Sequence, residues 1–317
     1  MAISSDTQNS SSTGKSNTQS VISKKEIKRL MKRSNIPALM RLFVWVALLI
    51  STGSLIWLSQ ETLWLVPALI LHGIVMVHHF SLQHECIHYS AFRERWINNI
   101  IAYYCGFLLL IPPLFFRYEH TSHHSHTNIK GEDAELIDLP SSFVEYFLYI
   151  SSFTYWKLQW SSFIRKVAGN LTEEEKAFIP QSEQNKVIWE SRLMAMFYLL
   201  IIFVVIRFQW YAPIWYWWLP VLLGEPFMRA IRMTEHVGCP QKADFKINTR
   251  TSLVSSPLRF LCWNMNYHAE HHFAPSVPFH ALPLLHEKLK DHITIERGGY
   301  LAAHKDIIGQ IRNKQAA

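Results

Sequence analysis

The sequence has few cysteines and lacks any pair of them with the spacing of a redox or zinc motif. Its four cysteines, Cys86, Cys105, Cys239 and Cys262, form no CxxC pattern, so we predict neither a disulfide framework nor a zinc knuckle. There is no RNA- or DNA-binding motif, and no apolar signal core within the first thirty residues, so we expect neither a nucleic-acid partner nor a secretory signal.

Charge is also scarce, because only 17% of the 317 residues are charged whereas 49% are hydrophobic. The hydrophobic residues gather in runs that are too long for a soluble core, which predicts an integral membrane protein. The formal net charge of +7 is carried outside these runs. This distribution fits basic cytoplasmic loops better than a surface for nucleic acid.

Four apolar segments are long enough to cross a bilayer core of about 30 Å, namely residues 37–58, 62–82, 191–208 and 213–231. The turns at 59–61 and 209–212 contain no Lys or Arg, whereas a basic segment, 24–33, precedes the first span. The chain is therefore predicted to be an all-α membrane bundle of four transmembrane helices, with both termini on the cytoplasmic side.

A fifth apolar segment, residues 97–116, is predicted not to cross. If it crossed, the histidines before and after it would lie on opposite faces of the membrane. Arg93 and Arg95 precede it and Arg117 follows it, so both of its ends favour the cytoplasmic side. The Pro112-Pro113 pair would break a straight helix. We expect this segment to enter the bilayer and return, or to lie at its surface.

The remaining segments are predicted to lie outside the bilayer. Residues 1–23 are polar and expected to be disordered, so residues 1–35 form a disordered and basic cytoplasmic N-terminus and 36–317 form the membrane domain. The aromatic-rich stretch 143–160 is expected to be a helix at headgroup level. Residues 170–186 are expected to be polar and cytoplasmic, and 286–317 a cytoplasmic helix.

Three compact histidine clusters stand out. Residues three or four apart lie on one face of a helix, so each cluster can direct its imidazoles to one place. A cytoplasmic helical cap that holds a metal site is therefore predicted. The clusters are His84 and His88; His120, His123 and His124; and His268, His271 and His272.

Eight imidazoles are too many for one ion, so two metals are implied. Imidazole binds Zn, Cu, Fe and Ni, and a dinuclear, nearly all-nitrogen site at a membrane surface favours iron that activates oxygen. A zinc hydrolase is the alternative, because hydrolases use a nearby carboxylate as a base. Glu85, Glu119, Glu235 and Glu270 each adjoin a proposed ligand; their other role would be to accept the second ring N–H and orient the ring.

A ninth histidine, His236, follows the fourth predicted span and is a candidate ligand. His72, His78 and His79 lie within the second span, where ionisable groups usually face the bundle interior; they are expected to line a path or support ligands. The other histidines are expected to be ordinary loop and surface residues: His126, His280, His286, His292 and His304.

The boxes His84-x3-His88, His120-x2-His123-His124 and His268-x2-His271-His272 resemble those of the membrane fatty acid desaturase and hydroxylase family. The stretch 266–278, Asn-Tyr-His-Ala-Glu-His-His-Phe-Ala-Pro-Ser-Val-Pro, together with Thr249-Arg250-Thr251 and Leu282-Pro-Leu-Leu-His286, looks like its bacterial branch, including the rhizobitoxine-desaturase-like subgroup. The resemblance covers about residues 40–290.

The resemblance implies a non-haem centre of two Fe ions, with O2 and two electrons as co-substrates. It implies that the eight box histidines are iron ligands and that His236 matches an additional histidine of acyl-CoA desaturases. Arg232 stands where those relatives have an asparagine, and box one is one residue shorter than theirs. We therefore do not infer an acyl-CoA substrate.

No His-Pro-Gly-Gly motif of a fused cytochrome b5 is present, so a separate donor of ferredoxin or cytochrome b5 type is expected. Arg93, Arg95 and Arg117 are candidates for docking an acidic carrier. Three readings remain: a desaturase of a fatty acyl chain or lipid; a hydroxylase of a lipid, carotenoid or small amino-acid-like molecule; and a membrane metal-binding or transport protein without redox chemistry.

Overall fold

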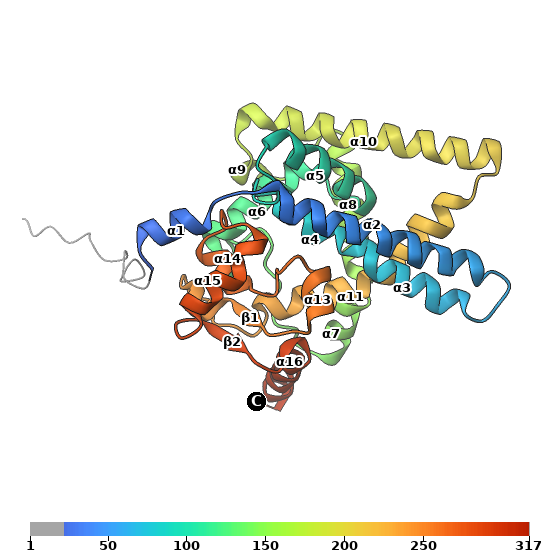
Figure 1. The fold of residues 1–317 in the computed structure, drawn as a ribbon. Helices are drawn as coiled ribbons and strands as arrows, with labels where there is room; N and C mark the ends of the chain where they lie inside the picture. Colours follow the sequence, from blue (N-terminus) through green and yellow to red (C-terminus); the bar gives the residue numbers. More distant parts are fainter. Residues whose placement is uncertain (1–21, 317) are drawn as a thin grey trace, which may run out of the picture.

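The computed structural model describes residues 22–316. Most of the disorder predicted for the N-terminus falls on residues 1–21, outside that range. The described chain is mostly helical, as predicted (Figure 1). Its strands are three residues each, β1 (Arg250–Ser252) and β2 (Thr294–Glu296), and they pair in parallel. The fold is therefore an all-α membrane bundle.

Three helices are long and apolar enough to cross a membrane. They are α2 (Asn35–Leu58), the run Leu65–Ile87 formed by α3 (Leu65–Val77) and α4 (His79–Ile87), and α10 (Gln181–Phe208). Only 17% of the most apolar window of α2 and of α10 is buried, so most of their apolar side chains face outward, as contact with lipid requires. In Figure 1, α10 and the pair α2 and α3 extend to the right, away from the C-terminal elements.

The segment predicted as the fourth span is helical but is not among these three. It consists of a π-helical turn, η2 (Ile214–Trp218), and α11 (Leu219–His236). α11 carries four charged residues, Glu225, Arg229, Arg232 and Glu235, all of them buried. These residues pair with one another and with Glu135, so one side of α11 faces the bundle interior, whereas Leu222 and Phe227 of the same helix are exposed.

Helix α11 packs against α3 at closest range where two glycines meet. A Cβ atom at Gly73 would lie 2.2 Å from the carbonyl oxygen of Pro220, and one at Gly224 would lie 2.2 Å from that of Gly73. No side chain fits at either position. The two backbones therefore touch, as small residues allow between membrane helices.

The segment predicted not to cross is broken into α5 (Arg95–Leu109) and α6 (Pro113–His126), which meet at 96°. Leu110 ends α5 in the left-handed region with φ of 61°, and Pro113 occupies the first position of α6, where its missing N–H is not needed. The predicted break at Pro112-Pro113 is confirmed. Counting this bent pair as one span would raise the number of candidate spans to four.

Three predicted helices have different bounds in the structure. The stretch 143–160 forms two helices, α7 (Phe143–Ile150) and α8 (Phe153–Val167), because Ser152 adopts a positive φ of 61° between them. α10 begins at Gln181, ten residues before the predicted start at 191. The tail contains α15 (Leu282–Leu289), β2 and α16 (Gly299–Ala316) instead of one helix. The helix is interrupted because residues 294–296 pair with β1 as a strand.

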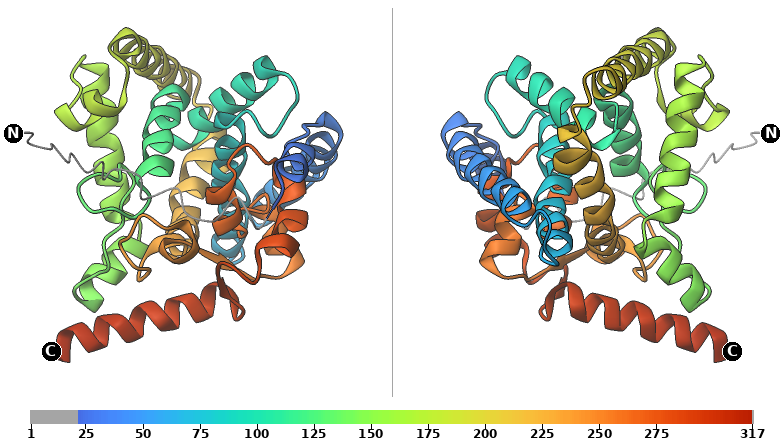
Figure 2. Two further views of the ribbon diagram at one scale, coloured as in Figure 1. Left: turned by 90° about the vertical axis from the view of Figure 1, so that its left-hand side faces the viewer. Right: turned by 90° about the vertical axis from the view of Figure 1, so that its right-hand side faces the viewer.

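The remaining elements are short. They include α1 (Lys24–Leu30), whose Ser23 and Glu26 form a capping box, and α9 (Glu173–Phe178), which has the same device in Thr172 and Glu175. The helix α16 lies along the lower edge in both views of Figure 2, away from α10 at the top. The others are α12 (Phe245–Asn248), α13 (Ser256–Leu261), α14 (His268–Phe273) and η3 (Phe279–Ala281).

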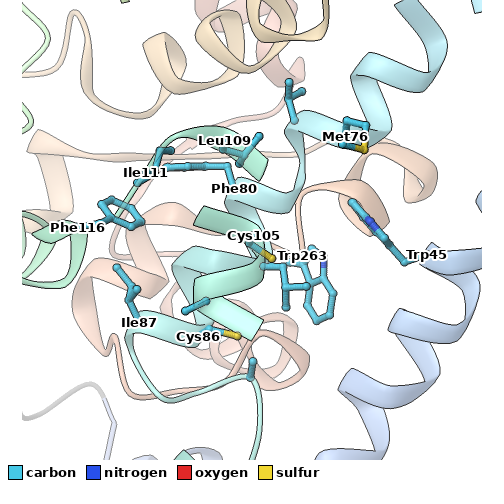
Figure 3. Packing of buried hydrophobic residues seen from close by; sticks show 14 of the residues in the cluster. Trp45, Met76, Phe80, Cys86, Ile87, Cys105, Leu109, Ile111, Phe116 and Trp263 are labelled. Atoms are coloured by element: carbon cyan, nitrogen blue, oxygen red, sulfur yellow. The ribbon is translucent and has the colours of Figure 1, made fainter. Parts of the chain in front are cut away.

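The largest apolar core joins the spanning helices to the C-terminal third. Trp45 of α2 packs against Trp263, with ring centroids 6.3 Å apart, and both side chains are fully buried. Phe80, Cys105 and Phe116 belong to the same cluster (Figure 3). This core fixes α4 and α6 against each other, and both helices carry histidine boxes.

Candidate metal centre

The three histidine boxes lie on helices with the register that their spacing predicted. His84 is in α4 and His88 is its C-terminal cap; the second box is in α6 and the third in α14. His236 is the last residue of α11. Four helices that are distant in sequence therefore deliver nine imidazoles to one place.

The nine imidazoles form two groups, and within each the candidate ligand atoms all lie within 4.8 Å of one another. We call them the five-histidine group and the four-histidine group. The five-histidine group draws on all three boxes, and the four-histidine group on the second and third boxes and His236. The members are His84, His88, His120, His124 and His271 in the first, and His123, His236, His268 and His272 in the second.

Distances between ring nitrogens fit metal binding. The Nε2 atoms of His120 and His124 lie 3.0 Å apart, as do those of His124 and His271. In the four-histidine group, His268 Nε2 lies 2.9 Å from that of His236 and 3.1 Å from that of His272. Two nitrogens bound at right angles to one ion, each at about 2.1 Å, would be about 3.0 Å apart.

Several ring nitrogens that face these groups have no protein partner. Among the described residues, buried Nε2 atoms of His84, His88 and His123 make no hydrogen bond. A buried polar atom without a partner lowers stability by about 1–3 kcal/mol. Three such nitrogens are therefore expected only where a bound group, such as a metal ion, accepts their lone pairs. The residues present therefore fit a pair of metal ions.

The protonation state of the rings also fits metal binding, which requires neutral imidazole. Burial, reinforced by the neighbouring rings, lowers the pKa of His268, His271 and His272 well below its usual value. Burial lowers the pKa of His88 to about 3. At neutral pH these rings have no proton to lose before they bind a cation.

Two carboxylates that the sequence did not single out orient the second box. His123 Nδ1 donates to Asp133 Oδ1 at 2.8 Å, and His120 Nδ1 donates to Glu135 Oε1 at 2.7 Å. Such bonds leave Nε2 free to bind a metal and raise the basicity of the ring. Asp133 and Glu135 belong to the loop after α6. The acidic composition of that loop was the only feature of the sequence that could have indicated carboxylates beside the second box.

Hydroxyl and carbonyl groups orient two rings of the four-histidine group. His236 Nδ1 lies 2.6 Å from Thr249 Oγ1 and 3.1 Å from the carbonyl of Asn248. The Thr127 hydroxyl donates to the His123 carbonyl at 2.8 Å, so it accepts from His272 Nδ1 at 3.1 Å. Both contacts turn Nε2 toward the group.

Three of the four glutamates that were candidates for orienting the box histidines have other partners. Glu85 accepts from the Ser90 hydroxyl and the Phe279 amide, Glu235 pairs with Arg232, and Glu270 accepts from Thr251 and His286. Within the described residues, none of the four hydrogen-bonds a box histidine. Residues that are neighbours in a helix point to different faces of it. The prediction that these glutamates orient the adjoining histidines was wrong for this reason.

Other histidines differ from their predicted surface role. His286 is buried, and its Nδ1 lies 2.5 Å from Glu270 Oε1, so it anchors the residue before His271. His304 lies 3.0 Å from the Tyr146 hydroxyl and 3.1 Å from the Ala230 carbonyl. His72, His78 and His79 face the interior as predicted, with His72 Nδ1 2.7 Å from Thr52 Oγ1.

A buried arginine lies between the two groups. Arg232 Nη2 donates to Glu135 Oε2 at 2.6 Å, and Arg232 Nη1 donates to Glu235 Oε2 at 2.9 Å. Glu135 is the carboxylate that holds His120. Glu235 Oε2 lies 3.8 Å from His268 Nε2. One guanidinium is thus connected to both histidine groups.

A cavity of about 330 Å³ adjoins the second box; we call it the central cavity. Its wall includes Phe80 and Phe116, whose rings lie 6.4 Å and 5.4 Å from those of His84 and His120. Arg229 and Arg232 also line it. A mostly carbon-lined space beside the histidines is suited to hold an apolar substrate.

Two further hollows flank α10. The tail groove, of about 300 Å³, is lined by Leu110, Trp156, Trp160, Ile202 and Trp217, among others. The outer groove, of about 380 Å³, lies on another side of α5 and α10 and includes Phe107, Leu193 and Ile201. Gln159, which lines the central cavity, donates its Nε2 to the carbonyl of Leu110, which lines the tail groove, at 2.5 Å.

Comparison with known proteins identifies the class of protein that this fold and site define. A family model described as fatty acid desaturase matches residues 62–302. The chain therefore belongs to the fatty acid desaturase family, whose members are membrane oxidoreductases.

Individual relatives are distant. The chain is 24% identical over 254 residues to the sn-1 oleoyl-lipid 12-desaturase of Picosynechococcus sp., covering 71% of this chain and 69% of the relative. It is 22% identical to the enzyme of the same name from Synechocystis sp., covering 78% and 76%. It is 24% identical to the chloroplastic omega-6 fatty acid desaturase of Brassica napus, covering 78% and 60%.

Proposed function

We propose that this protein is an O2-dependent di-iron desaturase that introduces a double bond into a fatty acyl chain of a lipid. The observation that carries the proposal is the gathering of nine imidazoles into two groups beside a mostly apolar cavity. The names of the relatives support a lipid substrate. Each group would hold one iron.

Two irons, once bound, would supply O2 activation and hydrogen removal from an unactivated C–H bond. The nine histidines hold the ions with neutral nitrogen ligands, and Asp133 and Glu135 carry negative charge that offsets that of the ions. Phe80 and Phe116 exclude water and hold a methylene of the substrate beside His84 and His120. The protein thus supplies position and a dry environment.

The acyl chain would pass the histidines in the central cavity and continue into the tail groove. Leu110 and Ile111 follow each other along one wall, and Leu158, Gln159 and Trp160 along the facing helix α8, so the two spaces share their boundary. The Gln159 side chain must turn away from the Leu110 carbonyl to admit the chain. Trp160 and Ile202 are exposed at the tail groove, so it opens toward lipid.

Electrons would come from a separate ferredoxin or cytochrome b5 on the cytoplasmic side, where the basic N-terminus and the metal centre would lie. Tyr89 follows His88 directly, and the guanidinium carbons of Arg95 and Arg117 lie 5.1 Å and 4.3 Å from its ring centroid. This places two positive charges beside a member of the five-histidine group. An acidic carrier that docks there would be close to the iron.

Lipid profiling of a host that expresses the wild type or His271→Ala tests the proposal. A new double bond that only the wild type produces identifies the reaction and the substrate together. A new hydroxyl group would instead assign the protein to the hydroxylases. Unchanged lipids, with stoichiometric zinc and no iron in the purified protein, would overturn the proposal in favour of metal binding without redox chemistry.

A further inference from the structure

A continuous chain of polar contacts joins the two histidine groups. It runs from His120 through Glu135 to Arg232, and from Arg232 through Glu235 to His268. The first three contacts are hydrogen bonds of 2.7, 2.6 and 2.9 Å, and the last, between Glu235 Oε2 and His268 Nε2, is 3.8 Å. Arg232 is the only cation in this chain of contacts.

We propose that Arg232 is a positioning residue that keeps Glu135 against the five-histidine group and keeps Glu235 out of the four-histidine group. This inference rests on the proposed function, because it assumes that both groups hold metal. One guanidinium thus holds two carboxylates in place, one beside a histidine group and one outside the other group. Glu135 must stay beside His120, and Glu235 must stay out of the four-histidine group.

The planar fork of arginine suits this task. Its two terminal nitrogens point in fixed directions, so each can hold a different carboxylate. Arg232 is 6% exposed, and burial of an ion is costly unless its partners are held in good geometry. A lysine at this position has the charge but lacks the second fixed direction, so it would hold one carboxylate well and the other poorly.

Glu235 has a reason to move if it is released. Its Oε2 atom is close enough to His268 Nε2 that a small rotation would direct the oxygen toward an ion held by the four-histidine group. A divalent cation attracts a carboxylate strongly in a buried environment. The salt bridge to Arg232 opposes that movement. Loss of Arg232 would therefore add an oxygen ligand to one metal and loosen His120 at the other.

Arg229 provides a matched control on the same helix. It is 8% exposed, lines the central cavity like Arg232, and pairs with Glu225 at 2.7 Å. Its guanidinium carbon lies 4.0 Å from the ring centroid of Tyr155. It has no contact with a carboxylate that holds a box histidine. Substitution of Arg229 disturbs a buried ion pair without touching the chain of contacts between the groups.

The test uses the full-length protein in detergent, stripped of metal and titrated with Co²⁺, whose absorption reports its ligands. We compare the wild type with Arg232→Gln, Arg232→Lys, Arg229→Gln and Arg229→Lys. For Arg232→Gln we expect binding of Co²⁺ at the five-histidine group to weaken by up to about 10-fold, no more than for loss of the Glu135 charge itself. We also expect the spectrum of Co²⁺ at the four-histidine group to change. Arg232→Lys should lie between it and the wild type, and both Arg229 variants should keep the wild-type spectrum.

The double variant Arg232→Gln/Glu235→Gln separates the two tasks of Arg232. Removal of the Glu235 charge should restore the wild-type spectrum at the four-histidine group and leave Co²⁺ binding weak at the five-histidine group. Equal spectra and affinities for the Arg232 and Arg229 variants would overturn the inference. If Arg232→Gln does not fold, the same comparison with Arg232→Lys decides. A wild type that binds two Co²⁺ but desaturates nothing would contradict the proposed function alone.

Discussion

In the four-histidine group three rings are held through Nδ1, whereas the five-histidine group has one such ring among the described contacts. Asp133, Thr249 and Thr127 fix His123, His236 and His272, and Glu135 fixes His120. Buried Nδ1 atoms of His84, His124 and His271 have no partner among the described residues. The four-histidine group relies on oriented rings, and the five-histidine group on a larger number of rings.

This difference predicts how each group responds to damage. A group of four ligands, of which three are oriented and His268 is not, has no ligand to spare, because a structural ion is usually held by four ligands. A group of five can lose one and still retain four. Conversely, the loss of an orienting side chain should affect the four-histidine group more, since it depends on orientation more.

Removal of one ligand from each group should have the largest effect. His268→Ala should lower the iron content to about one ion per chain, and His271→Ala should leave about two. His268→Ala should abolish desaturation because the reaction uses both irons. His271→Ala should abolish it because the iron at the five-histidine group keeps its place but has lost a ligand. Iron analysis and lipid profiling of the two purified variants check this. Equal iron loss in the two variants would contradict the distinction between the groups.

Removal of charge from the orienting carboxylates should have the next largest effect. Asp133→Asn should weaken metal binding at the four-histidine group by about 10- to 100-fold, since ligating histidines depend on such partners to that extent. Glu135→Gln should weaken binding at the other group by less, because four more ligands remain there. Metal titration of the two variants measures the difference, with Glu132→Gln as a control on the same loop.

Loss of an orienting hydroxyl should have a smaller effect. Thr249→Val removes a neutral hydrogen bond to His236 without much change of shape, which costs about 1 kcal/mol, or roughly fivefold in affinity. The Asn248 carbonyl still accepts from His236 Nδ1 at 3.1 Å and limits the loss. The affinity of the four-histidine group for Co²⁺ checks this. A loss as large as that of Asp133→Asn would show that charge is not what matters.

The smallest change in metal binding is expected for substitutions beside the tail groove and the outer groove. Ile202→Trp fills the tail groove, and Ile201→Trp, its neighbour on α10, fills the outer groove. We expect both to keep the wild-type iron content, and only Ile202→Trp to shift the products toward shorter acyl chains. Lipid profiling decides. An identical shift in both variants would exclude the tail groove as the path of the substrate.

The parts of the site with local sequence signals could be predicted. The i, i+3 and i+4 spacing of His120, His123 and His124 depends only on helix geometry, and Pro112-Pro113 breaks a helix in any surroundings. The 96° bend between α5 and α6 agrees with the requirement that the first two boxes meet, which was a constraint on residues 97–116. Each of these predictions uses residues that are close in sequence, or one simple constraint on the whole chain.

Other parts depend on the tertiary fold and have no local signal. Asp133 and Glu135 reach the second box because the loop after α6 turns back on it, which their acidic composition alone does not specify. His286 contacts Glu270 only because α15 packs on α14. Arg232 of α11 is buried because it pairs with Glu135, which is distant in sequence, whereas Arg229 pairs with Glu225 on the same helix and packs on Tyr155. The apolar pattern of residues 213–231 does not specify the partner of Arg232.

The contact between Gly73 and Gly224 sets how closely two helices that carry box histidines approach each other. α3 continues into α4, which bears His84 of the five-histidine group, and α11 ends at His236 of the four-histidine group. A single methyl group at either glycine would push the two helices apart and widen the distance between the two histidine groups. The spacing of the two candidate metal positions thus depends on the absence of a side chain among the packed helices.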